Sequence, residues 1–293
     1  MKNSRNDRLL AVIFYIITIL FAILCLYPFL LVIASSFTEE TTLLQNGYKL
    51  LPDRFSLDAY KAIFSTQTIP DAYLITIFVT VVGTTLSLLV TSLAAYALSG
   101  KRLRFSPQLS LFFYFTMLFS GGMVSSYILT TKYLHLQNSV WVYILPVLLS
   151  PWNMFLMRNF FNEIPKELFE SVKIDGAGEM KILRSIVLPL SLPALATIGL
   201  FYALGYWSSW APAMLYIDNP KLYSLQYIIM QIIRNVDMAQ NIAVAGAPST
   251  TQVTPAYTVR LATAMVTVGP IIFLYPFLQR YFVGGLKMGA IKG

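Results

Sequence analysis

The length of the uncharged apolar stretches constrains the fold of this sequence more than any other feature. No Asp, Glu, Lys or Arg occurs from Leu9 to Thr38, and none occurs over the 33 residues from Ser185 to Ile217. A helix of about 20 apolar residues crosses the hydrocarbon core of a bilayer, which is about 30 Å thick. The first stretch is twice as long as the apolar core of a signal peptide, which has roughly 7–15 residues, so we expect it to be retained as a membrane span.

Charged residues make up only 12% of the chain, against about 25% in soluble proteins. We therefore predict an all-α polytopic membrane protein with one transmembrane domain over residues 1–293. Small residues in the second span predict close packing inside a helix bundle, and Phe119 to Gly122 (FSGG) predicts a close-packed or kinked helix in the third. The six predicted spans cover residues 9–37, 72–99, 105–130, 136–157, 190–217 and 256–281. Loops at 38–71 and 218–255 are predicted outside, and a loop at 158–189 inside.

Lysine and arginine predict the orientation of these spans. With the amino terminus in the cytoplasm, the inner segments hold 14 of the 21 basic residues and six of the 13 acidic residues, whereas the outer segments are neutral. An excess of positive charge on the cytoplasmic side is typical of membrane proteins. Topology thus explains the net charge of +8 without nucleic acid, and both termini are predicted to be cytoplasmic.

Residues for catalysis or proton transfer do not occur in usable combinations. Gly100-Lys101 is the only Gly-Lys pair, and Ala95 stands where a phosphate-binding P-loop needs its first glycine. His135 is the only histidine, and Cys25 is the only cysteine, which we expect to be a small buried hydrophobic residue. Every acidic residue lies outside the predicted spans, which argues against a proton relay. We predict a subunit that is not an enzyme and that binds no metal or cofactor.

A polar segment from Glu170 to Pro189 separates the fourth predicted span from the fifth. Pro165 suits the first turn of a helix that would end at Asp175-Gly176, because glycine readily adopts the left-handed conformation that follows a helix C-terminus. A second helix can begin near Ala177 and lead into the next span. The segment therefore predicts a helix, a sharp corner and a second helix that project from the membrane toward a partner.

This segment resembles the EAA loop of ABC-importer permeases, with Glu170, Gly176 and the Ile186 to Pro189 sequence at the motif's spacing. Ser171 and Val172 replace its two alanines. The resemblance implies that the loop is the coupling helix, which docks in a cleft of the ATP-hydrolysing subunit; an ordinary cytoplasmic loop is the alternative. The implied coupling residues are Glu170, Ser171, Val172, Asp175, Gly176, Ala177 and Gly178.

Aromatic residues gather toward the end of the fifth predicted span. The GYWSSW stretch resembles the G-x-W-N-D-W sequence of polysaccharide-type permeases, with Ser208 and Ser209 replacing the amide and the acid. Flat apolar rings suit sugar rings, so Tyr206, Trp207 and Trp210 are implied to lie on a substrate path. An interfacial belt of aromatic residues is the alternative.

In the second predicted outer loop, the small and polar residues from Asn241 to Pro255 predict a flexible tract. In the resembled family this loop reaches toward the cleft of the sugar-binding protein, and a disordered connector is the alternative. The implied contact residues are Gly246, Ala247, Pro248, Ser249, Thr250 and Thr251.

The resemblance extends over nearly the whole chain, through MRNFF (157–161), DGAGE (175–179), YPFLQRYF (275–282) and the tail from Gly284. It is to carbohydrate permeases of the MalG type, in the subgroup that imports oligosaccharides, including alginate and aldouronate oligomers. The resemblance implies a multi-pass subunit of a prokaryotic cytoplasmic (inner) membrane, a range of substrates that includes acidic sugars, and three kinds of partner. These are a second homologous permease, two ATP-binding subunits that hold ATP and Mg, and an extracytoplasmic sugar-binding protein.

Two other functions fit a chain of this composition. A secondary transporter or channel for a polar solute would work without an ATPase partner, and the predicted cytoplasmic EAA loop argues against it. A membrane scaffold would show no ATP hydrolysis stimulated by substrate.

Overall fold

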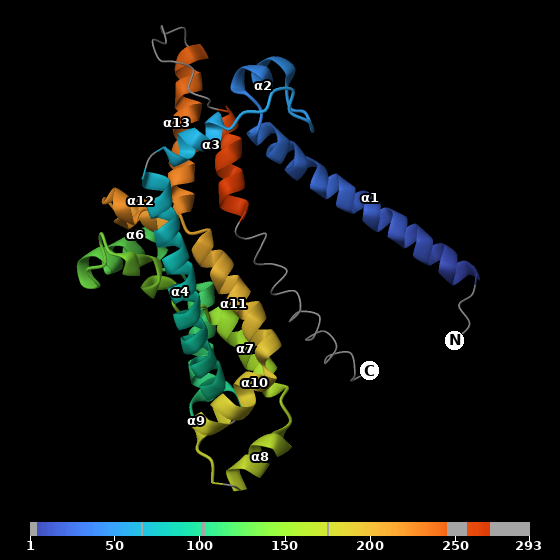
Figure 1. Cartoon of the computed structure of the whole chain (residues 1–293). Helices are drawn as coiled ribbons and strands as arrows, with labels where there is room; N and C mark the ends of the chain where they lie inside the picture. Colours follow the sequence, from blue (N-terminus) through green and yellow to red (C-terminus); the bar gives the residue numbers. More distant parts are fainter. Residues whose placement is uncertain (1–4, 66, 101–102, 175, 245–256, 270–293) are drawn as a thin grey trace. The chain divides into compact units, whose positions relative to one another are not determined.

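The computed structural model describes residues 5–65, 67–100, 103–174, 176–244 and 257–269 (Figure 1). Within them the chain forms two compact units: unit 1 contains residues 5–67 and 231–269, and unit 2 contains residues 68–230. The regular structure of the described residues is helical, apart from an isolated antiparallel bridge between Thr38 and Phe55. The all-α prediction is confirmed for this part of the chain.

Unit 1 contains the first long helix, which coincides with the first predicted span. Its segment from Leu10 to Ser36 is long and apolar enough to cross a membrane, and its most apolar part is not buried by the described residues. Cys25 is exposed on this helix, so the expectation of a buried thiol is wrong for the chain by itself. The helices of unit 1 are α1 (Arg5–Ser36), α2 (Glu40–Asn46), α3 (Asp58–Phe64), the part of α13 (Leu225–Val244) after residue 230, and a helix over residues 257–269.

Unit 2 is built around α4 (Thr68–Leu98), the second helix able to cross a membrane. Its other α-helices are α5 (Ser106–Leu118), α6 (Gly122–Ile128), α7 (Pro151–Asn162), α8 (Lys166–Ile174), α9 (Glu179–Ile182), α10 (Leu188–Leu190), α11 (Leu192–Trp207), α12 (Ala211–Tyr216) and the start of α13. Short π-helices η1 (Leu129–Tyr133) and η4 (Leu183–Val187) and 3-10 helices η2 (Val140–Tyr143), η3 (Leu145–Val147) and η5 (Pro220–Leu222) complete it.

The third, fourth and fifth predicted spans are each bent. The helix axes turn by 112° between Leu118 and Gly122, by 52° before Pro151, and by 83° at Ser191. At the first break Gly122 has a φ of +81°, which confirms the predicted kink in the FSGG sequence. With α1 and α4, the bent pairs give up to five crossing segments in the described residues. The number of six spans and their orientation remain predictions.

The core of unit 2 forms where α4 packs against α11, side by side in Figure 1. Gly83 of α4 leaves room for the ring of Tyr206, because a Cβ at position 83 would lie only 2.8 Å from two of its ring carbons. Two buried hydroxyl pairs bridge the helices: Ser87 with Tyr206 at 2.8 Å and Thr91 with Tyr202 at 2.7 Å. The small and hydroxyl residues of α4 thus allow the close packing that the sequence predicts.

Glu40, at the start of α2, holds the start of the helix over residues 257–269. Its carboxylate accepts hydrogen bonds from the backbone N–H of Tyr257 at 3.0 Å and of Thr258 at 2.8 Å, and from the Thr258 hydroxyl at 2.7 Å. Only 9% of Glu40 is exposed. The first N–H groups of a helix have no partner within it, and their dipole favours a negative charge. Glu40 therefore caps a helix 217 residues further along the chain.

We expect Glu40→Ala to lower the thermal stability of the protein, because it leaves the part-buried N–H of Tyr257 and the buried donors of Thr258 without this acceptor. Losing such a partner costs about 1–3 kcal/mol. Glu39→Ala is the control, since Glu39 makes a solvent-accessible ion pair with Arg54 at 3.6 Å, and exposed pairs contribute about 0–1 kcal/mol. Scanning calorimetry in detergent measures both. Equal shifts in the two variants would contradict the capping role.

Candidate functional site

The predicted corner after α8 is present, at one end of unit 2 in Figure 1. Gly176 has a φ of +75°, its N–H donates to the carbonyl of Lys173, and the N–H of Ala177 donates to the carbonyl of Val172. These two bonds form a Schellman motif, in which glycine in the left-handed conformation ends a helix. The corner directs the chain into α9, which begins at Glu179, two residues after the predicted start.

The surface of this loop mixes exposed polar and exposed apolar residues. Glu170, Ser171, Gly176 and Gly178 are exposed, whereas Val172 and Ala177 are half-buried and pack against the core; Asp175 lies outside the described residues. Two apolar side chains that the sequence analysis missed are also exposed, Ile174 at 86% and Met180 at 66%. They flank the corner, and apolar anchors surrounded by polar residues are typical of a protein-binding surface.

Glu179 fastens the corner to the rest of unit 2. One carboxylate oxygen, Oε1, lies 2.9 Å from Nζ of Lys173 at the end of α8. The other, Oε2, accepts a hydrogen bond of 2.6 Å from the hydroxyl of Tyr96 in the last turn of α4. The loop is thus attached by a polar contact to α4, which lies far from it in the sequence. Sequence analysis missed this role, because Tyr96 and Glu179 are 83 residues apart.

The predicted substrate-path residues differ in their surroundings. Tyr206 is 4% exposed, with its ring against Gly83 and its hydroxyl bonded to Ser87, so its contacts within the chain are those of a packing residue. Trp207 is 7% exposed and meets the ring of Tyr73 edge to face, with ring centroids 6.4 Å apart. Trp210 is 41% exposed and follows the end of α11. Of the three, Trp210 has the ring most available to a ligand.

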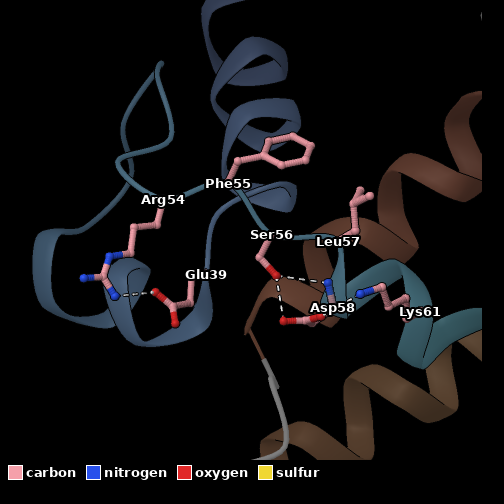
Figure 2. Close-up of a pocket in the computed structure, with 7 residues that line it drawn as sticks. All are labelled: Glu39, Arg54, Phe55, Ser56, Leu57, Asp58 and Lys61. Atoms are coloured by element: carbon pink, nitrogen blue, oxygen red, sulfur yellow. Dashed lines mark hydrogen bonds and ion pairs between the residues drawn. The ribbon is translucent and has the colours of Figure 1, made fainter.

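The predicted binding-protein contacts, residues 246–251, lie outside the described residues. The loop at 38–71, which the sequence predicts to lie outside, belongs to unit 1 up to residue 67 and carries a pocket of about 550 Å³ (Figure 2). Glu39, Arg54, Asp58 and Lys61 line it with two acids and two bases. A hydrogen bond from Ser56, followed in size of effect by one from Lys61, lowers the pKa of Asp58 below its usual value. This carboxyl is therefore ionised at neutral pH. The charges balance, and the pocket therefore has no electrostatic preference for an anion.

Long apolar helices with an exposed, corner-ended loop fit a membrane permease subunit. Comparison with known proteins agrees, because the family model for the inner membrane component of binding-protein-dependent transport systems matches residues 1–288. The chain belongs to this family. It is a transport subunit rather than an enzyme, and the resemblance to ABC-importer permeases is confirmed.

Individual relatives match over their full length. The polygalacturonan/rhamnogalacturonan transport system permease protein YtcP of Bacillus subtilis (strain 168) is 40% identical over 294 residues, covering 100% of both chains. Protein LplC of the same organism is 39% identical over 297 residues, covering 100% of this chain and 98% of the relative. A crystal structure of a bacterial ABC transporter involved in the import of the acidic polysaccharide alginate matches with a TM-score of 0.81 and 31% identity, covering 95% of this chain and 98% of that chain.

Proposed function

We propose that this chain is a permease subunit of an ATP-driven ABC importer that carries an acidic oligosaccharide across the cytoplasmic membrane. The observation that carries the proposal is the exposed α8 with its Schellman corner at Gly176, in a chain of the binding-protein-dependent family. A surface of this form, with Ile174 and Met180 exposed beside it, suits docking to a separate ATPase subunit. ATP and Mg would be held by that subunit and not by this chain.

The proposed docking residues are Glu170, Ser171, Val172, Asp175, Gly176, Ala177 and Gly178. The proposed assembly contains a second homologous permease, two ATPase subunits and an extracytoplasmic sugar-binding protein. Residues 246–251 are proposed to contact the binding protein. Trp210, together with the buried Trp207 and Tyr206, is proposed to lie beside the substrate path.

Two observations favour an acidic sugar. The relative YtcP is named for polygalacturonan and rhamnogalacturonan, and the structural relative for alginate; polygalacturonan and alginate are polymers of uronic acids. The predicted spans hold no Asp or Glu, so an anion passing along them meets no fixed negative charge. A buried carboxylate would repel a uronate, whereas small polar and aromatic side chains do not.

The test is ATP hydrolysis by the complete importer in proteoliposomes, with substrate presented on its own binding protein. We expect oligogalacturonates or alginate oligomers to raise the rate at least about fivefold, a typical coupling strength. Fully methyl-esterified oligogalacturonates are the matched control, since they keep the sugar rings and lose the charges. Stimulation by the ester alone would contradict the acidic substrate, and uptake that needs no ATPase subunit would contradict the importer.

A further inference from the structure

The hydrogen bond between Tyr96 and Glu179 lies where the proposed docking loop meets the membrane helices. Glu179 is the first residue of α9, immediately after the corner, and its two carboxylate oxygens contact different elements, Lys173 of α8 and Tyr96 of α4. Hydrogen bonds to an ionised acceptor are shorter and stronger than neutral ones. The 2.6 Å distance to Tyr96 fits such a bond.

Tyr96 is firmly held on the α4 side of this contact. It is 6% exposed and belongs to the core cluster of unit 2. Its carbonyl accepts hydrogen bonds from the N–H of Ser99 at 3.2 Å and from the Ser99 hydroxyl at 2.8 Å, which close the end of the helix. A displacement of its hydroxyl therefore moves the end of α4 and not only a free side chain.

From Tyr96 the connection continues along α4 into the interior of unit 2. About one and a half and two and a half turns away, Thr91 and Ser87 pair with the hydroxyls of Tyr202 and Tyr206 on α11. Tyr202 also accepts a hydrogen bond of 3.0 Å from the N–H of Ser150, which precedes α7. Polar contacts thus join α8 to Glu179, Glu179 to α4, and α4 to α11, and the backbone of α4 completes this series between Tyr96 and Thr91.

We infer that Tyr96 and Glu179 are positioning residues that pass movement of the docked α8 to α4 and from there to the membrane-spanning helices. The inference rests on the proposed function of α8 as the docking helix. It assigns to one hydrogen bond, between residues that touch neither ATP nor sugar, a part of the coupling between ATP hydrolysis and transport. Ile182, Leu183 and Val187 of α9 and η4 are buried in the core of unit 2, so we expect the loop to keep its place when the hydrogen bond is removed.

Tyr96→Phe tests this, since it removes the hydroxyl and keeps the ring in the core. In the reconstituted importer we expect substrate-stimulated ATP hydrolysis to fall about fivefold, within the usual range of coupling between sites. Basal hydrolysis and co-purification of the ATPase subunit should stay unchanged. Glu179→Ala should give at least as large a loss, because it removes this hydrogen bond together with the ion pair to Lys173, and the double variant should be no worse than Glu179→Ala alone, since Tyr96→Phe then removes no further contact. Tyr143→Phe is the matched control, since it removes another buried tyrosine hydroxyl, bonded to the carbonyl of Leu222 at 2.8 Å and away from this series.

Each outcome decides one claim. Normal stimulation of Tyr96→Phe in a complex that responds to substrate would overturn the inference and leave the proposed function intact. Additive losses, an equal loss in Tyr143→Phe, or a loss of ATPase subunit from the complex would also overturn it, because they indicate a general structural role. No stimulation of the unsubstituted complex by any oligosaccharide would instead count against the proposed function.

Discussion

Gly176→Val is expected to abolish most of the stimulation of ATP hydrolysis by substrate while leaving the membrane helices folded. Gly176 has a φ of +75°, a conformation that costs other residues about 1–2 kcal/mol and a β-branched residue more. A Cβ at this position would meet no atom within 4 Å, so the effect comes from the backbone and not from a clash. A valine would shift the corner out of the Schellman geometry, and α8 would present Ile174 in a different direction.

We expect a loss of about tenfold in stimulated hydrolysis, which corresponds to about 1.4 kcal/mol. Gly176→Asn is the control at the same position, because asparagine tolerates the left-handed conformation and can end a helix in the same way. The measurement is the ATPase rate of the reconstituted complex with substrate-loaded binding protein. Full stimulation of the valine variant, or an equal loss in the asparagine variant, would show that the corner's conformation does not matter for coupling.

Gly83→Val is expected to have the second large effect, on stability and assembly. Even the Cβ of the new residue would lie 2.8 Å from Cε2 and Cζ of Tyr206, and this ring cannot easily turn away because its hydroxyl is bonded to Ser87. Overpacking of this kind typically costs about 1–3 kcal/mol. The two added methyl groups increase the overlap, so we expect loss of the α4–α11 packing and a lower yield of assembled protein.

Gly205→Val is the matched control for this substitution. Gly205 is on α11, next to Tyr206, and a Cβ there would meet no atom within 4 Å in the described chain. Thermal unfolding followed by size-exclusion chromatography compares the two variants. Adding Tyr206→Ala to Gly83→Val should restore part of the lost stability, since it removes the ring that overlaps. A Gly83→Val protein as stable as the Gly205 variant would contradict the close contact.

Local sequence patterns predicted local structure well in this chain. The helix end at Gly176 depends on glycine's backbone freedom, and the kink at Gly122 depends on the same property, so both can be identified from a few neighbouring residues. Small residues in the second predicted span likewise predicted close helix packing, and this span is α4, which packs against α11 and α7. The helical class could also be predicted, because a long uncharged apolar stretch that crosses a bilayer must satisfy its backbone hydrogen bonds within a helix.

Contacts between distant residues could not be predicted in this way. Glu179 looks like an ordinary surface acid of a cytoplasmic loop, and its pairing with Tyr96 depends on where α4 ends in space. Glu40 caps a helix that begins more than 200 residues later. By sequence, the aromatic residues near Trp207 fit an interfacial belt or a sugar path, because the exposure that separates these alternatives is a property of the packed chain.

The hydroxyl pairs between α4 and α11 have a mechanical consequence. Sliding of one helix along the other would break the Ser87–Tyr206 and Thr91–Tyr202 bonds together and push the ring of Tyr206 out of the space left by Gly83. Shear between these two helices is therefore unfavourable, and the contacts favour their moving together as one body. Such a body needs compliant joints at its ends. In the described part of unit 2, Ser191, where the helix axis turns by 83° before α11, and the non-helical residues 208–210 after α11 are placed to act as these joints.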